Sequence, residues 1–564
     1  DSKDMKYRYN WNAPIIWSQH EPNTYYHGAQ LLLRTRDNGI NWEEVSPDLS
    51  NNEKQKQGKG GGPYTNEAVG AENYGTLAYV AESPHEKGVI WAATDDGVLQ
   101  LTKDGGKNWS VITPKGLPET LINSIEVSPH DKATAYIATT RFKFNDYTPA
   151  LYKTTNHGKS WTNISAGIPM GAYTRVVRED TKRKDLLFAG TELGMYISWN
   201  GGEKWHSFQL NLPTTPITDL KISHGDLSVA TMGRSFWVLD DLGLLRQFKG
   251  RDTSFALLQP EDAIIGNWYS QLNSSSDNVT GSDDSQGVNP TNGVVFYYYL
   301  PTAAKDVTLT LVIKDANGNM VRTIRSQANA DYLEYPSGPS PEPLLSNKTG
   351  LNRFVWDMRY TSLPGIPTAY IEGSFRGQKA MPNNYTASIQ QAKKVSEVSF
   401  NIVPNPLYDV TKEAYQETHD FKTKTEKNIT DMHLSVNNLK KVQSQISLIL
   451  KDLPKETTYN KVKSSGEAIV KKLKSWDEDM VQRKSKAYDD VENFPNKFTA
   501  EYIFLMNQND SGLPKVNQAS KNRLAELDKQ WAVLKKISEA LINIDIPAYN
   551  QLLWDQGIGA LKTK

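Results

Sequence analysis

One eight-residue pattern, Ser/Thr-x-Asp/Asn-x-Gly-x-x-Trp, restricts the fold of this chain more than any other feature of its sequence. The pattern occurs four times, at 35–42, 102–109, 154–161 and 198–205. The Asp or Asn side chain can accept hydrogen bonds from backbone N–H groups of the same turn, and glycine adopts the positive φ that closes a hairpin. The tryptophan then packs as a large apolar anchor. Four copies in order predict a structure made of repeated hairpins.

Each copy lies in a longer repeating unit. Apolar or aromatic stretches that precede the copies are predicted strands, at 24–26, 89–92, 135–138 and 186–189. The copies start at 35, 102, 154 and 198, which are 67, 52 and 44 residues apart. Four short strands at such intervals are typical of β-propeller blades. A fifth unit, 217–241, lacks the pattern and is expected to end the array.

Four full units and one partial unit are too few to close a propeller, which typically has more blades. Two explanations are open: an N-terminal portion is missing, or a partner chain supplies the other blades. We favour the missing portion. The chain starts Asp1-Ser2-Lys3-Asp4, without the apolar stretch of a signal peptide, and we expect this start to be a processed end or a fragment.

The pattern changes after the fifth unit. The polar segment 251–291 is predicted to be a linker, and the alternating stretches of 292–405 predict a small β-sandwich. From 406 to 564, apolar stripes at helical spacing predict a bundle of about three to five helices. One stripe comprises Leu524, Leu527, Trp531, Leu534, Ile537 and Leu541. The predicted fold is therefore multidomain and mainly β, with propeller blades at 1–250, the sandwich and a C-terminal helical bundle.

Composition excludes several classes of function. The 64 basic and 64 acidic residues cancel, so no polybasic surface for nucleic acid is expected. The chain has no cysteine, which excludes disulfides, thiolate nucleophiles and cysteine-ligated metals. Its nine histidines show no metal-binding spacing, so we expect neither a metal nor a cofactor. No apolar run approaches the roughly 18–20 residues that span a bilayer, so no membrane span is expected.

The repeated pattern is similar to the Asp-box, or BNR repeat, of sialidases, sortilin-type VPS10 domains and xyloglucanase-like glycoside hydrolases. Further stretches resemble a Bacteroidota-type family of large exported sortilin/BNR-repeat proteins, often labelled glycosyl hydrolase: 4–14, 74–76, 81–85, 175–180 and 233–241. The resemblance implies that this chain is the C-terminal portion of a longer family member. It also implies an immunoglobulin- or fibronectin-III-like sandwich and an extracytoplasmic location, in the periplasm, at the outer membrane or on the cell surface.

The Asp-box residues are predicted to be structural because every unit repeats them. They are Asp37, Trp42, Asp104, Trp109, Asn156, Trp161, Asn200 and Trp205. Asn replaces Asp in two copies, which indicates that the turn needs no charge. His20, His85 and His130 also share one position of successive units, and we predict a structural role for them as well.

Candidate site residues are non-repeating charged residues near the predicted innermost strands, because propellers usually bind ligands at their axis. Glu72 and Asp180 are the candidate catalytic acids. A glycoside hydrolase needs two carboxyl groups about 5–5.5 Å apart for retention or about 6.5–9.5 Å apart for inversion. The candidate ligand-binding residues are Arg141, Arg178, Glu179, Glu192 and Arg234. For each residue, an inter-blade salt bridge or a loop cap is the favoured alternative.

The arginines do not have the surroundings of a sialidase triad, and no xyloglucanase-type acid pair aligns with the chain. Aromatic clusters at Trp17, Tyr25 and Tyr26 and at 297–299 are able to stack on sugars, but strand packing is the favoured interpretation. We therefore predict a binding or scaffold protein of the cell envelope that recognises a protein, peptide or glycan at the propeller axis.

Two alternatives stay open. One is a xyloglucanase- or sialidase-like glycoside hydrolase acting on polysaccharide. The other is a subunit of a larger outer-membrane or surface complex, in which the helical bundle contacts other envelope proteins.

Overall fold

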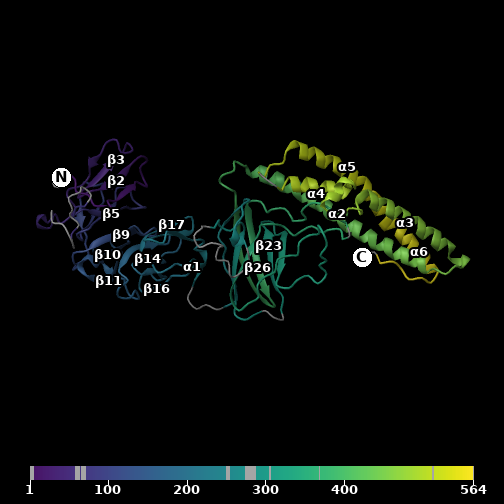
Figure 1. Ribbon diagram of the computed structural model, residues 1–564, viewed down its shortest axis with the longest axis horizontal. Coiled ribbons are helices and arrows are strands. Elements are labelled where there is room, and N and C mark those ends of the chain that lie inside the picture. The colour runs from purple at the N-terminus through teal and green to yellow at the C-terminus, as the bar shows by residue number, and fades with distance from the viewer. Residues whose placement is uncertain are drawn as a thin grey trace. The chain divides into compact units, whose positions relative to one another are not determined.

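The computed structural model describes residues 5–57, 64, 72–248, 254–273, 288–303, 307–367, 369–510 and 513–562. The chain divides into two compact units, Asp1–Phe248 and Lys249–Lys564. In its described part, the first unit consists of sheets, one short α-helix and two 3-10 turns, whereas the second contains sheets followed by long helices (Figure 1). The predicted order of propeller-type sheets, sandwich and helical bundle is confirmed.

The first unit consists of five antiparallel sheets, each built from consecutive strands, which we call blades 1–5. Blade 1 contains β1 (Ile15–Trp17), β2 (Tyr25–Gly28), β3 (Leu32–Thr35) and β4 (Glu43–Glu44). Blade 2 contains β5 (Leu77–Glu82), β6 (Ile90–Thr94), β7 (Leu99–Thr102) and β8 (Ser110–Val111). Blade 3 contains β9 (Leu121–Val127), β10 (Ala135–Arg141), β11 (Asp146–Thr154) and β12 (Thr162–Asn163). Blade 4 contains β13 (Thr174–Glu179), β14 (Leu187–Thr191), β15 (Gly194–Ser198) and β16 (His206–Ser207).

Blade 5 has three strands, β17 (Ile217–Ser223), β18 (Asp226–Thr231) and β19 (Phe236–Leu239), and the short helix α1 (Gly243–Gln247) follows it. The first strands of successive blades lie against one another: β5 contacts β9, β9 contacts β13, and β13 contacts β17. The five blades therefore form one continuous array with these first strands on its inside.

The Asp-box turns join the third and fourth strands of blades 1–4. In blade 2, the Gly106 N–H donates to the Thr102 hydroxyl at 3.0 Å, and the Asn108 N–H donates to Asp104 Oδ1 at 2.9 Å. Gly106 has a φ of 100°, which a residue with a Cβ adopts only with strain. In blade 3, Asn156 Oδ1 accepts the Ser160 N–H at 3.0 Å. An amide oxygen thus closes the turn in the same way as a carboxylate.

The Asp-box tryptophans of blades 2, 3 and 4 join each of these blades to the preceding one. The indole N–H of Trp109 donates to the Val45 carbonyl of blade 1 at 3.2 Å. The equivalent bonds run from Trp161 to Ile112 at 2.7 Å and from Trp205 to Ile164 at 2.6 Å. Trp42 in blade 1 donates only within its own turn, to Gly39 at 3.1 Å. The joints between blades 1 and 2, 2 and 3, and 3 and 4 therefore each have an indole hydrogen bond, whereas blade 5 has no Asp-box tryptophan.

The repeated histidines make a second set of inter-blade bonds. Nε2 of His20 lies 2.8 Å from the Ser83 carbonyl, and Nε2 of His85 lies 2.9 Å from the Ser128 carbonyl. His130 makes the same bond to the Asp180 carbonyl at 2.7 Å. A carbonyl only accepts, so the proton of each neutral ring is on Nε2. These contacts give the histidines a structural role.

Burial differs between internal and terminal blades. Every residue of β14 and β15 in blade 4 is buried, so both faces of that sheet are covered. In blade 5, β17 and β18 bury one face, while Phe236 and Val238 of β19 are exposed. In blade 1, Ile15 and Trp17 are exposed. Each terminal blade therefore presents one partly uncovered face.

The second unit begins with a β-sandwich of two sheets. The first sheet has the strand order β20-β22-β25, formed by Ala256–Leu257, Val294–Leu300 and Gly350–Trp356. The second has the order β21-β27-β26-β23-β24, formed by Ala263–Ile264, Lys394–Val403, Asn383–Gln391, Leu309–Asp315 and Met320–Arg325. Strict alternation of buried and half-buried residues along β22 directs one face of that sheet into the core. The rings of Phe296, Trp356, Tyr385 and Phe400 meet there.

The segment 251–291 is not only a linker. Its strand β20 pairs with β22, and its strand β21 pairs in parallel with β27. These strands have two residues each, which is too short for a recognisable hydrophobic period. Residues 251–253 and 274–287 of the segment lie outside the described part of the chain.

The helical region contains five α-helices: α2 (Lys412–Asp452), α3 (Asn460–Met480), α4 (Phe498–Gln508), α5 (Gln518–Ala540) and α6 (Ile546–Asp555), with a π-helical turn, η7 (Leu541–Asp545), between the last two. Thr411 caps α2 by accepting the Ala414 N–H, and Asn517 caps α5 by accepting the Ser520 N–H. Among the described residues, no helix combines the length and apolar composition that crossing a bilayer requires.

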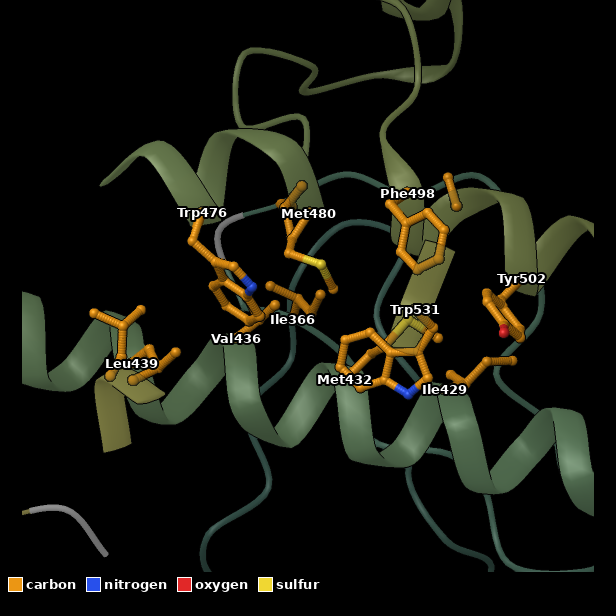
Figure 2. Close-up of a cluster of buried hydrophobic side chains, with 14 of the residues drawn as sticks. Ile366, Ile429, Met432, Val436, Leu439, Trp476, Met480, Phe498, Tyr502 and Trp531 are labelled. Carbon is orange, nitrogen blue, oxygen red and sulfur yellow. The ribbon is translucent and has the colours of Figure 1, made fainter. Parts of the chain in front are cut away.

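Figure 2 shows the core of the helical region, where Met432 and Val436 of α2 face Trp476, Met480 and Trp531. Ile366, from the segment between β25 and β26, also enters this core. The helices thus pack on one another and on a long loop of the sandwich.

The predicted stripe on α5 is correct at Leu524, Leu527 and Trp531 but wrong at Ile537, which is exposed. Ser538 is buried in its place, seven residues after Trp531 and therefore on the same helix face. The sequence pattern selected Ile537 because it is apolar, whereas the buried position belongs to the next residue, Ser538.

Acid should destabilise the second unit through His433 of α2. This ring is fully buried, with Nδ1 2.6 Å from the Pro364 carbonyl, and burial lowers its pKa to about 4. A histidine in an unfolded chain has a pKa of about 6.5. Between about pH 6.5 and 4, His433 therefore takes up a proton in the unfolded chain but stays neutral in the folded protein. The free energy of unfolding should therefore fall over this range, by up to about 3 kcal/mol.

Denaturant unfolding of wild type and His433→Gln, repeated from pH 7 to pH 4, measures this effect. The stability difference between the two proteins should shrink as the pH falls. His206→Gln, which changes an exposed histidine of β16, should leave the pH profile unchanged. A difference between wild type and His433→Gln that is independent of pH would contradict the assignment.

Candidate functional site

The inner strands of the blades line two adjoining hollows, which we call the axial groove. One hollow has a volume of about 720 Å³ and the other about 520 Å³. Both are lined by Ile15, Ile16, Tyr79, Val80 and Asp219. Because β1, β5, β9, β13 and β17 all contribute, the groove follows the inside of the blade array. It is the concave surface on which a propeller usually binds its ligand.

The two sides of the blade array contribute different chemistry to the groove. Strands β1 and β5 supply Ile15, Ile16, Trp17 and Tyr79 to its lining, together with one carboxyl group, that of the buried Glu82. Strands β9, β13 and β17 supply Glu126, Arg178, Asp219 and Lys221. Trp17 is 71% exposed, so its ring is available to a ligand. Strand packing, the favoured interpretation of Trp17 from the sequence, is therefore wrong.

Arg178 forms the centre of the groove's polar network. Its Nε donates to the Leu220 carbonyl at 2.8 Å, and its Nη1 donates to Ser124 Oγ at 2.7 Å and the Val177 carbonyl at 2.8 Å. Its Nη2 donates to Tyr79 Oη at 2.9 Å and Asp219 Oδ1 at 2.7 Å. All five N–H groups of the guanidinium are thus used within the protein. Arg178 connects four inner strands and holds Tyr79 and Asp219 in place.

Two carboxyl groups lie beside this guanidinium. Asp219 is bonded to Nη2, and Glu126 Oε2 lies 3.8 Å from Nη1. Burial raises the pKa of Glu126 to about 7, although the charge of Arg178 acts in the opposite direction. Asp219 is mostly exposed. The groove therefore contains a partly buried carboxyl group with a pKa near neutral, Glu126, and an exposed carboxylate, Asp219, in addition to the buried carboxyl group of Glu82.

The predicted catalytic pair is not brought together. Glu72 accepts a hydrogen bond from Trp11 Nε1 at 2.6 Å and pairs with Asn10 through the backbone. Asp180 is fully buried, lies 2.9 Å from Arg246 Nη2 and accepts the Arg183 N–H at 2.6 Å. Asp180 has no surface to offer a substrate, so its contacts are those of a structural ion pair.

Of the predicted ligand-binding residues, only Arg178 lines the groove. Glu179 is buried and accepts the Asp185 N–H at 2.8 Å. Arg141 pairs with Asp146 at 3.0 Å, and Arg234 is exposed in the turn before β19. Glu192 is 2.6 Å from Arg175, which lines the smaller hollow, so Glu192 affects the groove only through that arginine.

Sequence reasoning missed Glu126, Asp219 and Lys221. A signal for two of them was present in the repeats. The inner strands of the five blades can be aligned with one another at their last residues. The aligned position, which is the last residue of the strand or the residue after it, holds Ser18, Ser83, Ser128, Asp180 and Ser223. Two residues before each of these positions stand Ile16, Ala81, Glu126, Arg178 and Lys221, and all five line the larger hollow. Blade alignment thus identifies a ring of groove residues.

A third hollow, of about 730 Å³, lies between blades 1 and 2 at the Asp-box turns. Four of its charged side chains are already paired: Arg34 with Glu43 at 2.6 Å and Lys87 with Glu21 at 2.9 Å. Among the residues that the structure describes, no group of three or more His, Asp or Glu side chains is placed to hold a metal ion.

Comparisons with known proteins give no match in sequence and a partial similarity in structure. No protein-family model matches it, and no curated protein matches its sequence. Solved structures give partial similarity. An ancestral GH74 enzyme is 13% identical, with a TM-score of 0.32, over 70% of this chain and 53% of its own. The GH74 xyloglucanase from Xanthomonas campestris is 16% identical, with a TM-score of 0.32, over 68% of this chain and 63% of its own.

YCF48 bound to D1 peptide is 13% identical, with a TM-score of 0.24, over 58% of this chain and 93% of its own. This chain thus covers less than two thirds of either GH74 enzyme. Similarities at this level do not indicate the activity of this chain. The fold is assigned from the strands and helices of the chain itself. The resemblance to the Bacteroidota-type exported family remains a prediction.

Proposed function

We propose that this protein is an extracytoplasmic binding or scaffold protein of the cell envelope, and that its axial groove binds an extended stretch of glycan or polypeptide. The observation that carries the proposal is the composition of the groove, with an exposed tryptophan and mainly apolar residues on β1 and β5 and most of the charged groups on β9, β13 and β17. Sugars and peptides present both apolar and hydrogen-bonding surfaces, which such a lining complements.

The Arg178 network supports binding over cleavage. A hydrolase needs room for the scissile bond between its two carboxyl groups. Here Glu126 and Asp219 approach the same guanidinium, which bridges them. Since all five donors of Arg178 are already bonded, its contribution is to fix the lining rather than to contact a reacting atom.

Glycoside hydrolysis is the second candidate, and one observation favours it. Glu126, whose pKa is raised to about 7, lies near an exposed carboxylate, and a protonated acid beside an ionised one is the usual arrangement in glycosidases. For this activity, Arg178 would have to leave its position between the two groups. Glu126→Gln should then abolish the release of reducing ends.

Binding through the groove predicts a large effect of Trp17→Ala. A central interface tryptophan typically contributes about 2 kcal/mol or more, so affinity should fall about 30-fold. Arrays of oligosaccharides from cell-wall and envelope polysaccharides, and arrays of peptides, are probed with the full chain and the variant. Because Trp17 is exposed, its removal should leave the fold intact.

Trp554→Ala is the matched control. Trp554 of α6 is 72% exposed, against 71% for Trp17, and it lies in the second unit. Its removal should change no array signal. Signals that survive Trp17→Ala unchanged, or that disappear equally in both variants, would exclude the axial groove as their origin.

A further inference from the structure

A small pocket lies in the second unit, between the sandwich and the helices. Its volume is about 70 Å³, and its lining includes Lys379 from the segment before β26, Tyr415 and Lys422 from α2, and Asp510 from the residues after α4. Since a water molecule occupies about 30 Å³ in the liquid, the pocket has room for a group of only a few atoms. It is separate from the axial groove, which belongs entirely to the first unit.

Positive charge exceeds negative charge around this pocket. Lys422 Nζ lies 3.2 Å from Asp510 Oδ1, and Arg359 Nη2 lies 2.8 Å from Asp510 Oδ2, so two cations share one carboxylate. Lys379 Nζ donates to the Gly266 carbonyl and, at 3.0 Å, to Asn267 Oδ1, both of which are uncharged. Burial of a cation without a matching anion is costly.

Neighbouring carboxylates do not remove this excess. Burial raises the pKa of Glu426 on α2 to about 7, so its charge is incomplete near neutral pH. Asp357 is shared between Arg322 at 3.0 Å and Arg376 at 2.8 Å. The described residues around Lys379 and Lys422 therefore leave net positive charge at the pocket.

An unused hydroxyl is also present. Tyr415 is 5% exposed, and among the described residues its hydroxyl donates no hydrogen bond, although the backbone N–H of Asn405 interacts with its oxygen. Tyr415 and Lys422 are seven residues apart on α2, which places both on the same face of the helix. The pocket thus combines two ammonium groups and one free hydroxyl donor within a small volume.

We propose that this pocket binds a small oxyanion, a carboxylate or a phosphate, which accepts hydrogen bonds from Lys379, Lys422 and the Tyr415 hydroxyl. Hydrogen bonds from ammonium groups to an anion are stronger than those between neutral groups, and the anion balances the excess charge. Burial lowers the pKa of Lys379 to about 8. The affinity should therefore decrease as the pH rises above about 8.

Calorimetric unfolding of the full chain in sodium acetate, sodium phosphate or sodium chloride, at pH 7 and matched ionic strength, tests the proposal. Acetate, phosphate or both should raise the melting temperature of the second unit in a saturable way, by about 2–4 °C at ten times the dissociation constant. Chloride should not. A rise with acetate alone identifies a carboxylate ligand, and a rise with phosphate alone identifies a phosphate ligand.

Two variants connect the shift to the pocket. Lys379→Met should lower the affinity for the active anion at least tenfold, and Tyr415→Phe, which keeps the ring and removes the hydroxyl, should lower it as well. Lys393→Met, at the exposed turn between β26 and β27, should behave as wild type. Equal effects of all three salts, or a shift that both pocket variants retain, would overturn the proposal. If Lys379→Met does not fold, Tyr415→Phe decides alone.

Discussion

Trp205→Ala should destabilise the first unit by about 3–5 kcal/mol, as large-to-small changes of buried tryptophans do. Trp205 is 2% exposed, and its indole N–H donates to the Ile164 carbonyl of the preceding blade at 2.6 Å. The alanine variant loses both the packing and this inter-blade bond, and it leaves Ile164 without its partner. Native-state hydrogen exchange, which reports the two units separately, measures the loss in strands β9 to β16.

Trp42→Ala is the matched control, because Trp42 occupies the same Asp-box position in blade 1. Trp42 is 40% exposed, and its indole donates only to Gly39 of its own turn. We expect a loss below about 1 kcal/mol, which is usual for a partly exposed side chain outside a core. Equal losses in the two variants would show that the tryptophan acts within its own turn, and that our account of the blade joints is wrong.

Asp180→Asn should have the second large effect, a loss of about 3–5 kcal/mol in the first unit. The variant keeps the shape of the side chain but removes the negative charge that lies against the buried Arg246 guanidinium. In the wild type, Arg246 Nη2 lies 2.9 Å from Asp180 Oδ2, and both side chains are almost entirely inaccessible to solvent. Arg246→Met in the Asp180→Asn background should recover part of the loss, since the buried cation is then removed as well.

Asp146→Asn provides the comparison for Asp180. Asp146 pairs with Arg141 at 3.0 Å, but both side chains are partly exposed, so we expect a loss below about 1 kcal/mol. Thermal unfolding and hydrogen exchange follow both variants. A stable Asp180→Asn protein that had lost an enzymatic activity would instead support the catalytic role considered from the sequence.

The fold was predictable to the extent that it depends on repeated or periodic residues. The Asp-box turns recur with the same chemistry, and α3 has a regular stripe through Ile469, Leu473 and Trp476. Features fixed by a single long-range contact were missed. The strands β20 and β21 have two residues each, so they show no alternation of apolar and polar residues. They form because their backbones pair with the edge strands β22 and β27.

The site was less predictable because it depends on how the blades pack. Arg178 was identified as a charged residue near an inner strand, but its partners Ser124 and Asp219 come from β9 and β17, 54 and 41 residues away in sequence. Charge alone did not separate Asp180, which pairs with Arg246, from Glu126, which lines the groove. Aligning the inner strands would have placed Glu126 and Lys221 beside Arg178 in the same ring.

The central claim is that the axial groove holds its ligand without cleaving it. The most direct test incubates the full chain with each oligosaccharide or peptide that the arrays retain, and measures product release by wild type and by Glu126→Gln. We predict that the ligand is recovered intact from both proteins. Repeated turnover by wild type that Glu126→Gln abolishes would contradict the claim and make the groove a hydrolase site.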